Sequence, residues 1–164
     1  MLADKGFQII PEIARQYFEK ELAKGRTVEE IRTDDTALQR SIAAMQLRLE
    51  HACQATKVTF LDRAFPDSLT FYRIFGMDPN EIILDCFHHR YANVFILDRL
   101  PFQRNKTLGP EDNSSSNFLD EWLERDYGAL GYDVIRVPVL PPEERLAYIL
   151  VKCTENRRTY LRLV

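Results

Sequence analysis

Two oppositely charged residues come directly after a strand predicted over residues 58–61. The run Val58-Thr59-Phe60-Leu61 is β-rich and continuous, as in a strand buried on both faces of a parallel sheet, and Asp62 and Arg63 follow it. In phosphate-transferring α/β proteins a carboxylate here holds Mg²⁺, directly or through water, or accepts the acceptor's proton, and an arginine beside it contacts phosphate. The alternative is a carboxylate that only caps the following turn, and the sequence leaves both interpretations open.

A second pair of charges follows the first predicted strand, residues 7–10. Glu12 and Arg15 are one helical turn apart at the start of the next predicted helix, so both side chains can face the mouth of that strand. There the two residues would bind the acceptor of a transferred phosphate. The alternative is a surface ion pair worth less than about 1 kcal/mol.

A polar stretch over residues 104–117 carries two cations near its start. It contains Gly, Pro, Asn, Asp and three consecutive serines, so it has almost nothing to bury and is predicted to be a loop. Arg104 and Lys106 would bring positive charge to the transferring group if this loop closed as a lid. The alternative is a solvated loop that takes no part in binding.

The other reactive residue types form no recognisable site. The adjacent His88 and His89 would point about 100° apart on a helix and have no third ligand at helical spacing, which argues against a metal site there. The three cysteines are odd in number, lack C-x-x-C spacing and are interpreted as small buried apolar residues. Asp62 therefore remains the one expected metal contact, to Mg²⁺ through water.

The elements that must position these residues alternate along the chain. Strands are predicted over residues 7–10, 58–61, 93–98 and 132–138, and helices over 11–24, 38–52, 66–75, 80–90, 118–130 and 141–153. This order predicts an α/β fold, a three-layer sandwich with a mostly parallel sheet, with residues 1–153 as one domain and 154–164 as a tail. Ligands of such sheets bind beyond the carboxyl ends of the strands, where Glu12, Asp62, Arg63 and Asp98 lie.

Composition and charge exclude several partners. The 164 residues carry a formal net charge of -3, so no basic field draws the chain onto nucleic acid or an anionic membrane. No apolar run approaches the ~20 residues that span a bilayer, and the first residues lack the pattern of a secretion signal. We therefore expect a cytoplasmic protein whose ligand is a small molecule, a nucleotide being the class that the strand-end charges suit.

The order of segments resembles the AAA-type ATPase/kinase domain family linked to NAD metabolism, over roughly residues 2–151. The segments that carry the resemblance are residues 6–15, 60–72 and 130–138, followed by Glu143-Glu144-Arg145. It implies a P-loop, nucleotide-kinase-like fold with ATP and Mg²⁺ as cofactors. It also implies that Asp62 and Arg63 match the family's Asp-Arg pair after its third strand, and that Glu12 and Arg15 match the exit of its second strand.

The chain departs from this family pattern in two places. Family members open with a strand and a G-x-x-x-x-G-K-[ST] loop that cradles phosphates, and no such stretch occurs in these 164 residues. The lid pattern Gln-Asp-Gly-x-Arg is replaced by Gln103-Arg104-Asn105-Lys106-Thr107. We therefore expect an N-terminally truncated ATPase/kinase-like domain that is inactive as it stands, with ATP and Mg²⁺ used only by an intact form. The alternative is a non-catalytic interaction or regulatory module on the same scaffold.

An absent first strand has a structural consequence. That strand is central in kinase-like P-loop sheets, so its absence leaves unpaired backbone groups on two neighbours, each costing about 1–3 kcal/mol when buried. Whole-domain stability is only about 5–15 kcal/mol, so the gap must be repaired. The repairs considered are insertion of residues 159–164, closure of the flanking strands, a strand from a partner chain in an oligomer, and a natural start further upstream.

Overall fold

The computed structural model of this chain describes residues 1–53, 57–88, 90–100 and 113–160. These residues fall into two compact units, Met1–His89 and Arg90–Val164. Each unit combines one pair of parallel strands with helices, which confirms the α/β class predicted from the sequence. A single sheet in a three-layer sandwich, with residues 1–153 as one domain, stays a prediction.

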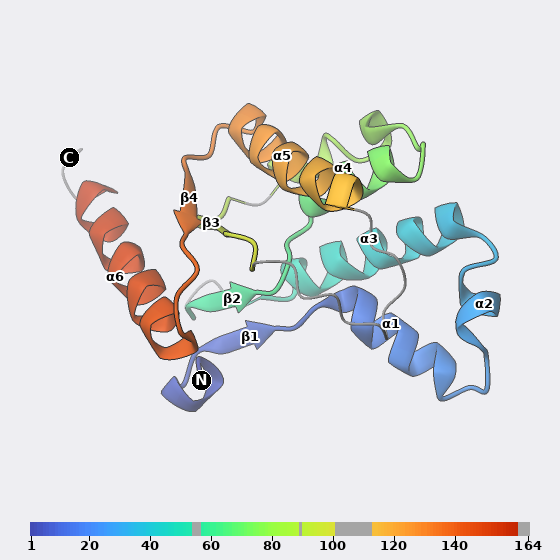
Figure 1. The fold of residues 1–164 in the computed structure, drawn as a ribbon, viewed down its shortest axis with the longest axis horizontal. Helices are drawn as coiled ribbons and strands as arrows, with labels where there is room; N and C mark the ends of the chain where they lie inside the picture. The colour runs from blue at the N-terminus through green and yellow to red at the C-terminus, as the bar shows by residue number, and fades with distance from the viewer. Residues whose placement is uncertain (54–56, 89, 101–112, 161–164) are drawn as a thin grey trace. The chain divides into compact units, whose positions relative to one another are not determined.

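The first unit is built around strands β1 (Gln8–Ile10) and β2 (Thr59–Leu61). They lie side by side and point the same way, with Gln8 opposite Thr59 and Ile10 opposite Leu61 (Figure 1). A further backbone hydrogen bond, from Asp62 to Ile10, extends the pairing at 2.8 Å. The carboxyl ends of both strands therefore meet at one edge, as the sequence predicts.

Four helices complete this unit: α1 (Ile13–Leu22), α2 (Val28–Ile31), α3 (Asp35–His51) and α4 (Asp67–Ile74). A capping box between Thr27 and Glu30 starts α2, and the Asp34 side chain accepts a hydrogen bond from the Ala37 backbone at the start of α3. Helix α3 packs against both α1 and α4. The core includes Ile13 and Leu69, which are almost fully buried.

Helix α1 ends beside a buried carboxylate. The Glu21 side chain accepts hydrogen bonds from Lys24 at 2.6 Å and from Arg26 at 3.0 Å. These two hydrogen bonds lower the pKa of Glu21 below its ordinary value of 4.5. The chain then turns at Gly25, whose φ of 86° is the left-handed conformation that glycine adopts without strain.

The helix predicted over residues 80–90 is wrong. Two short 3₁₀-helices, η2 (Pro79–Glu81) and η3 (Asp85–Phe87), are found in place of the predicted α-helix. Another 3₁₀-helix, η1 (Ala3–Lys5), lies near the start of the chain. Ile82 and Cys86 are buried, but Phe87 is exposed, so the apolar residues do not share the one face that an α-helix would bury.

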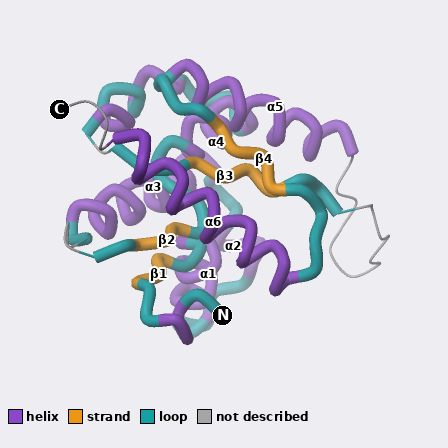
Figure 2. The backbone as a smooth tube through the Cα atoms, turned by 90° about the vertical axis from the view of Figure 1, so that its left-hand side faces the viewer, coloured by secondary structure: helices purple, strands orange, loops and turns teal. Residues whose placement is uncertain are grey.

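The second unit repeats the strand-pair arrangement. Strands β3 (Val94–Leu97) and β4 (Val134–Val137) lie side by side (Figure 2). They are parallel, with Val94 opposite Val134 and Leu97 opposite Val137. Helix α5 (Asn113–Ala129) packs against both strands, and helix α6 (Pro142–Tyr160) packs against β4. The core of this unit contains Tyr127 and Val137, which has no exposed surface.

Two boundaries in this unit differ from the sequence predictions. Helix α5 begins at Asn113, so the last part of the predicted loop 104–117 is helical, and residues 101–112 lie outside the described residues. Helix α6 continues to Tyr160, so most of the predicted tail is helical. Thr159 and Tyr160 therefore cannot form the strand that was considered as a repair of the sheet.

Within the described parts of the chain, the strands form two separate two-stranded sheets, β1-β2 and β3-β4. Each strand is thus hydrogen-bonded to a single neighbour. None of the described helices has both the length and the apolar character needed to cross a bilayer. A cytoplasmic location stays a prediction.

Candidate functional site

The strand ends of the first unit bring Glu12 and Arg63 together. Each residue lies two positions beyond its strand, and the Nε atom of Arg63 is 2.9 Å from the Oε1 atom of Glu12. Both side chains are about one-third exposed, so the pair is accessible to a ligand. The parallel register of β1 and β2 explains why residues so far apart in the sequence meet here.

The backbone of Arg63 is in an unusual conformation. Its φ of 71° makes it the one non-glycine residue with positive φ among those described. This left-handed conformation costs a non-glycine residue roughly 1–2 kcal/mol, so the surroundings must hold it in place. The guanidinium group lies over the ring of Phe71, 4.9 Å from the ring centroid, in a cation–π contact.

A buried polar network from α3 holds this loop. The Gln46 side-chain nitrogen donates to the Arg63 carbonyl at 3.1 Å and to the Glu50 carboxylate at 2.6 Å. Glu50 also accepts a hydrogen bond from the Phe65 backbone at 2.8 Å. Gln46 and Glu50 are 4% and 5% exposed, so these bonds form away from water. The network therefore fixes the loop that carries Asp62 and Arg63.

The sequence analysis missed these two residues. The apolar residue Leu49 is 39% exposed, whereas the polar Glu50 next to it is buried. The available signal was the spacing of Gln46 and Glu50, one helical turn apart on the face that points inward.

A cavity of about 180 Å³ opens beside the Glu12–Arg63 pair. Its walls come from the start of α1, from α3, and from the β2–α4 loop with α4. Eight of the sixteen lining residues are apolar or aromatic and eight are polar or charged, so the cavity suits a small molecule with both apolar and hydrogen-bonding parts. The lining residues are Glu12, Ile13, Ala14, Phe18, Arg32, Asp35, Leu38, Gln39, Ile42, Gln46, Arg63, Ala64, Asp67, Ser68, Phe71 and Phe75.

One face of α3 forms the long wall of this cavity. The lining positions Asp35, Leu38, Gln39, Ile42 and Gln46 recur at the three- and four-residue spacing of a single helix face. Asp35 and Gln46 are separated by roughly 16 Å along the helix axis. The cavity therefore has two polar ends, one at Gln46 and Arg63, and the other at Asp35 and Gln39.

The remaining predicted site residues lie in different places. Asp62 and Arg15 are exposed and are not part of the cavity lining. Glu12 pairs with Arg63, so the predicted alternative of a surface ion pair between Glu12 and Arg15 is wrong. Arg104 and Lys106 lie outside the described residues.

The fit of these residues to Mg²⁺ is limited to one carboxylate. No group of three or more His, Cys, Asp or Glu side chains in the described residues is placed to hold a metal ion. Magnesium is often held by only one or two carboxylates together with waters and substrate phosphates. The described residues therefore do not form a metal site by themselves, and a water-mediated contact of Asp62 to Mg²⁺ stays a prediction.

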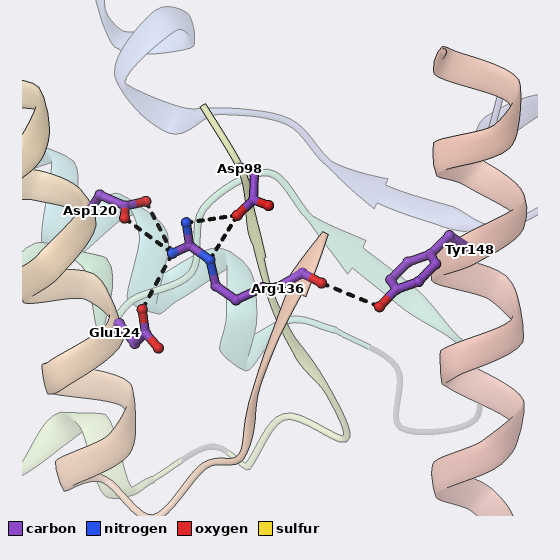
Figure 3. Close-up of polar contacts among 5 residues, drawn as sticks. All are labelled: Asp98, Asp120, Glu124, Arg136 and Tyr148. Atoms are coloured by element: carbon purple, nitrogen blue, oxygen red, sulfur yellow. Dashed lines mark hydrogen bonds and ion pairs between the residues drawn. The ribbon is translucent and has the colours of Figure 1, made fainter. Parts of the chain in front are cut away.

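The strand-end carboxylate of the second unit is used in a local ion-pair cluster. The Arg136 guanidinium on β4 lies 2.8 Å from Asp98, 3.2 Å from Asp120 and 3.4 Å from Glu124, and these contacts are drawn in Figure 3. Its backbone carbonyl accepts a hydrogen bond from the Tyr148 hydroxyl on α6 at 3.4 Å. The cluster therefore ties β4 to β3 and to both helices of this unit.

Burial of Arg136 by itself would lower the pKa of its side chain. The hydrogen bonds to Asp120 and Asp98 outweigh that effect and raise the pKa, so the group is always charged. Because Asp98 is engaged with this cation, its carboxylate has a structural role in the described residues.

Arg90 likewise has a structural role. Its guanidinium donates to the Leu130 carbonyl at 2.8 Å, just beyond the last residue of α5, and stacks 4.1 Å from the Tyr132 ring centroid. A cation that binds the carbonyls of a helix C-terminus stabilises that end of the helix. His88 pairs with Asp85 at 3.2 Å, and His89 lies outside the described residues.

Comparison with known proteins adds one finding to this geometry. Residues 1–145 match the family model described as an AAA domain. No curated protein and no solved structure matches the chain. Intact members of this AAA-type P-loop family depend on a nucleotide and Mg²⁺, whereas the link to NAD metabolism stays a prediction. Because the match spans most of the 164 residues, the chain belongs to the AAA-domain family, whose scaffold binds nucleotides.

Proposed function

We propose that the first unit carries the acceptor-binding part of a phosphoryl-transfer site. The ancestral reaction is transfer of phosphate from ATP to a small nucleotide or nucleoside. The observation that carries this proposal is the cavity that opens beside the Glu12–Arg63 pair, at the carboxyl ends of two parallel strands. Ligands of open α/β sheets bind at this edge, and aromatic walls combined with polar groups suit a nucleoside.

The two paired residues have complementary roles in this proposal. Glu12 accepts a hydrogen bond from the acceptor hydroxyl and orients it. Arg63 presents a guanidinium whose planar donors match phosphate oxygens. The held backbone of Arg63 supports this role, because strained residues cluster where a ligand must be positioned.

Three further roles extend beyond the cavity. Asp62 would contact Mg²⁺ through water and Arg15 would contact phosphate from the exposed side of α1. Arg104 or Lys106 would supply positive charge from the lid. These roles require a nucleotide whose triphosphate is held by a glycine-rich loop.

We propose that residues 1–164 do not transfer phosphate by themselves. They contain no G-x-x-x-x-G-K-[ST] stretch, so no backbone cradle, lysine or Ser/Thr is present for the triphosphate and its Mg²⁺. The same absence supports the alternative function, a non-catalytic interaction or regulatory module on this scaffold. Contribution of a strand by a partner chain is a separate proposal, and light scattering of the purified chain would test it.

Calorimetric titration distinguishes these functions. We expect this chain to bind nucleosides or nucleoside monophosphates and to show no micromolar binding of Mg-ATP. Turnover of ATP in the presence of a nucleoside, measured as the release of ADP, would contradict the proposed inactivity. If neither nucleosides nor nucleotides bind, the proposed acceptor site is wrong and the interaction module is favoured.

A matched pair of variants locates the binding. Arg63→Met removes the guanidinium from the cavity and should weaken binding of a nucleoside monophosphate by about tenfold or more. Arg40→Met removes an equally well-formed ion pair, 2.8 Å from Arg40 to Glu81, at a position that does not line the cavity. Binding by Arg40→Met should equal that of the wild type. An equal loss in both variants would mean that the effect does not come from the cavity.

A further inference from the structure

The end of the cavity remote from Arg63 contains a carboxylate without a hydrogen-bond partner. Asp35 lines the cavity, and its Oδ1 atom is buried and receives no hydrogen bond from any described residue. A buried polar atom in this state costs free energy unless something pairs with it. The position of Asp35 therefore requires an explanation.

Capping of α3 does not supply that explanation. Asp34 caps the helix, because its Oδ1 atom accepts from the Ala37 backbone at 2.9 Å and from the Thr36 hydroxyl at 2.6 Å. Asp35 is the next residue and makes neither contact. As an acidic residue in the first turn of α3, Asp35 also stabilises the helix through its dipole. That interaction leaves its Oδ1 atom without a hydrogen bond, which a ligand in the adjoining cavity would supply.

A second polar group lies on the same wall. Gln39 is one helical turn after Asp35, is half-buried and lines the same cavity. The aromatic side chains of Phe18, Phe71 and Phe75 line the cavity as well. Flat apolar walls combined with polar groups at one end suit a planar ring whose edge carries hydrogen-bonding groups.

Resting on the proposed function, we propose that Asp35 is the residue that selects the base of the nucleoside acceptor. A carboxylate only accepts hydrogen bonds, so the base edge that faces it must donate. An amino group satisfies this requirement, and a carbonyl oxygen in the same place leaves two acceptors facing each other. The cavity therefore favours nucleosides whose base presents an amino group over those that present a carbonyl.

In this proposal, opposite ends of the cavity contact different parts of the acceptor. Arg63 and Glu12 act on the hydroxyl or phosphate of the acceptor, and Asp35 with Gln39 acts on its base. A site with a buried polar group discriminates strongly against a ligand that leaves that group unpaired. The selectivity of the site should then depend on Asp35 and not on the phosphate end.

Two matched ligand pairs test the proposal. Cytidine and uridine differ by an amino group in place of a carbonyl at one ring position, and guanosine and xanthosine differ in the same way. Calorimetric titration of the wild-type chain should show the amino member of a pair binding about tenfold more tightly than the carbonyl member. Asp35→Asn, whose amide also donates, should remove or reverse this preference.

Asp4→Asn is the matched control variant. Asp4 is 81% exposed, lies on η1 and does not line the cavity, so its replacement should leave the preference unchanged. Circular dichroism of each variant checks its folding, and the wild-type comparison needs no variant at all.

The outcomes separate this proposal from the function on which it rests. Equal binding of both members by the wild type, or a preference that Asp35→Asn retains, would overturn the role of Asp35 while the acceptor site stands. Failure of all four nucleosides to bind would overturn both. If Arg63→Met binds all four nucleosides more weakly but still prefers the amino member of each pair, the result would support both the acceptor site and the role of Asp35.

Discussion

Replacing Arg63 by glycine and by alanine separates the strain in its backbone from the contacts of its side chain. Both substitutions remove the 2.9 Å ion pair with Glu12 and the cation–π contact with Phe71. The ion pair is about one-third exposed and contributes ~0–1 kcal/mol, and the cation–π contact contributes about 0.5–1 kcal/mol. The shared loss is therefore roughly 0.5–2 kcal/mol of the free energy of unfolding.

The two variants differ in the backbone. Arg63 has a φ of 71°, which alanine adopts only at a cost of roughly 1–2 kcal/mol and glycine adopts freely. Glycine also loses more conformational entropy on folding, about 0.4–1 kcal/mol, which offsets part of this gain. We expect Arg63→Gly to be more stable than Arg63→Ala by about 0.5–1 kcal/mol, the reverse of the usual order.

Urea unfolding followed by far-ultraviolet circular dichroism measures this difference. Hydrogen exchange of peptides that cover residues 59–75 assigns it to the first unit. Because both variants lack the side chain, their difference reports the backbone alone. If Arg63→Ala equals or exceeds Arg63→Gly in stability, the left-handed conformation is not held in the folded protein, and the reasoning about a positioned Arg63 is refuted.

Three other perturbations have defined outcomes. Gln46→Leu leaves Glu50 with one hydrogen bond fewer in a buried site and should lower the free energy of unfolding by about 1–3 kcal/mol, measured by urea unfolding. Glu21→Gln should lower stability near neutral pH but not in acid: the pKa of this carboxyl is lowered by its hydrogen bonds, so its contribution is present above 4.5 and is lost as the pH falls. Thermal unfolding of both proteins across this range should therefore converge at low pH. Arg136→Met leaves three carboxylates close together and should destabilise the second unit by about 1–3 kcal/mol, with a smaller loss at high salt in thermal unfolding.

Local patterns in the sequence determined much of the fold. Short β-rich runs closed by charge, glycine or proline predicted all four strands, because buried parallel strands are continuous and apolar. Helical spacing and capping residues predicted five of the α-helices, and α1, α3 and α4 agree with the prediction to within three residues at both ends. Helix α5 begins five residues before its predicted start, and α6 ends seven residues after its predicted end. The segment at residues 80–90 failed because its apolar residues suit a helix locally, while burial of Ile82 and exposure of Phe87 are set by the rest of the unit.

A general rule of α/β sheets predicted Glu12 and Arg63 as site residues. The carboxyl ends of parallel strands form the ligand-binding edge of α/β sheets, so Glu12 and Arg63 were candidates before any contact was known. The family match over residues 1–145 agrees with the resemblance seen in the segment order. Sequence alone therefore identified the family scaffold and predicted the strand edge beside which the candidate cavity opens.

Only the tertiary structure decided how those residues are used. Glu12 pairs with Arg63 and not with the nearer Arg15, because strand register brings the two loops together. Asp98 is engaged by Arg136 from the neighbouring strand, so its charge serves the fold. Contacts of this kind join residues far apart in the chain, and local periodicity carries no information about them. The buried side chains of α3 that hold Arg63 and line the cavity could likewise be recognised only once the helix was packed in place.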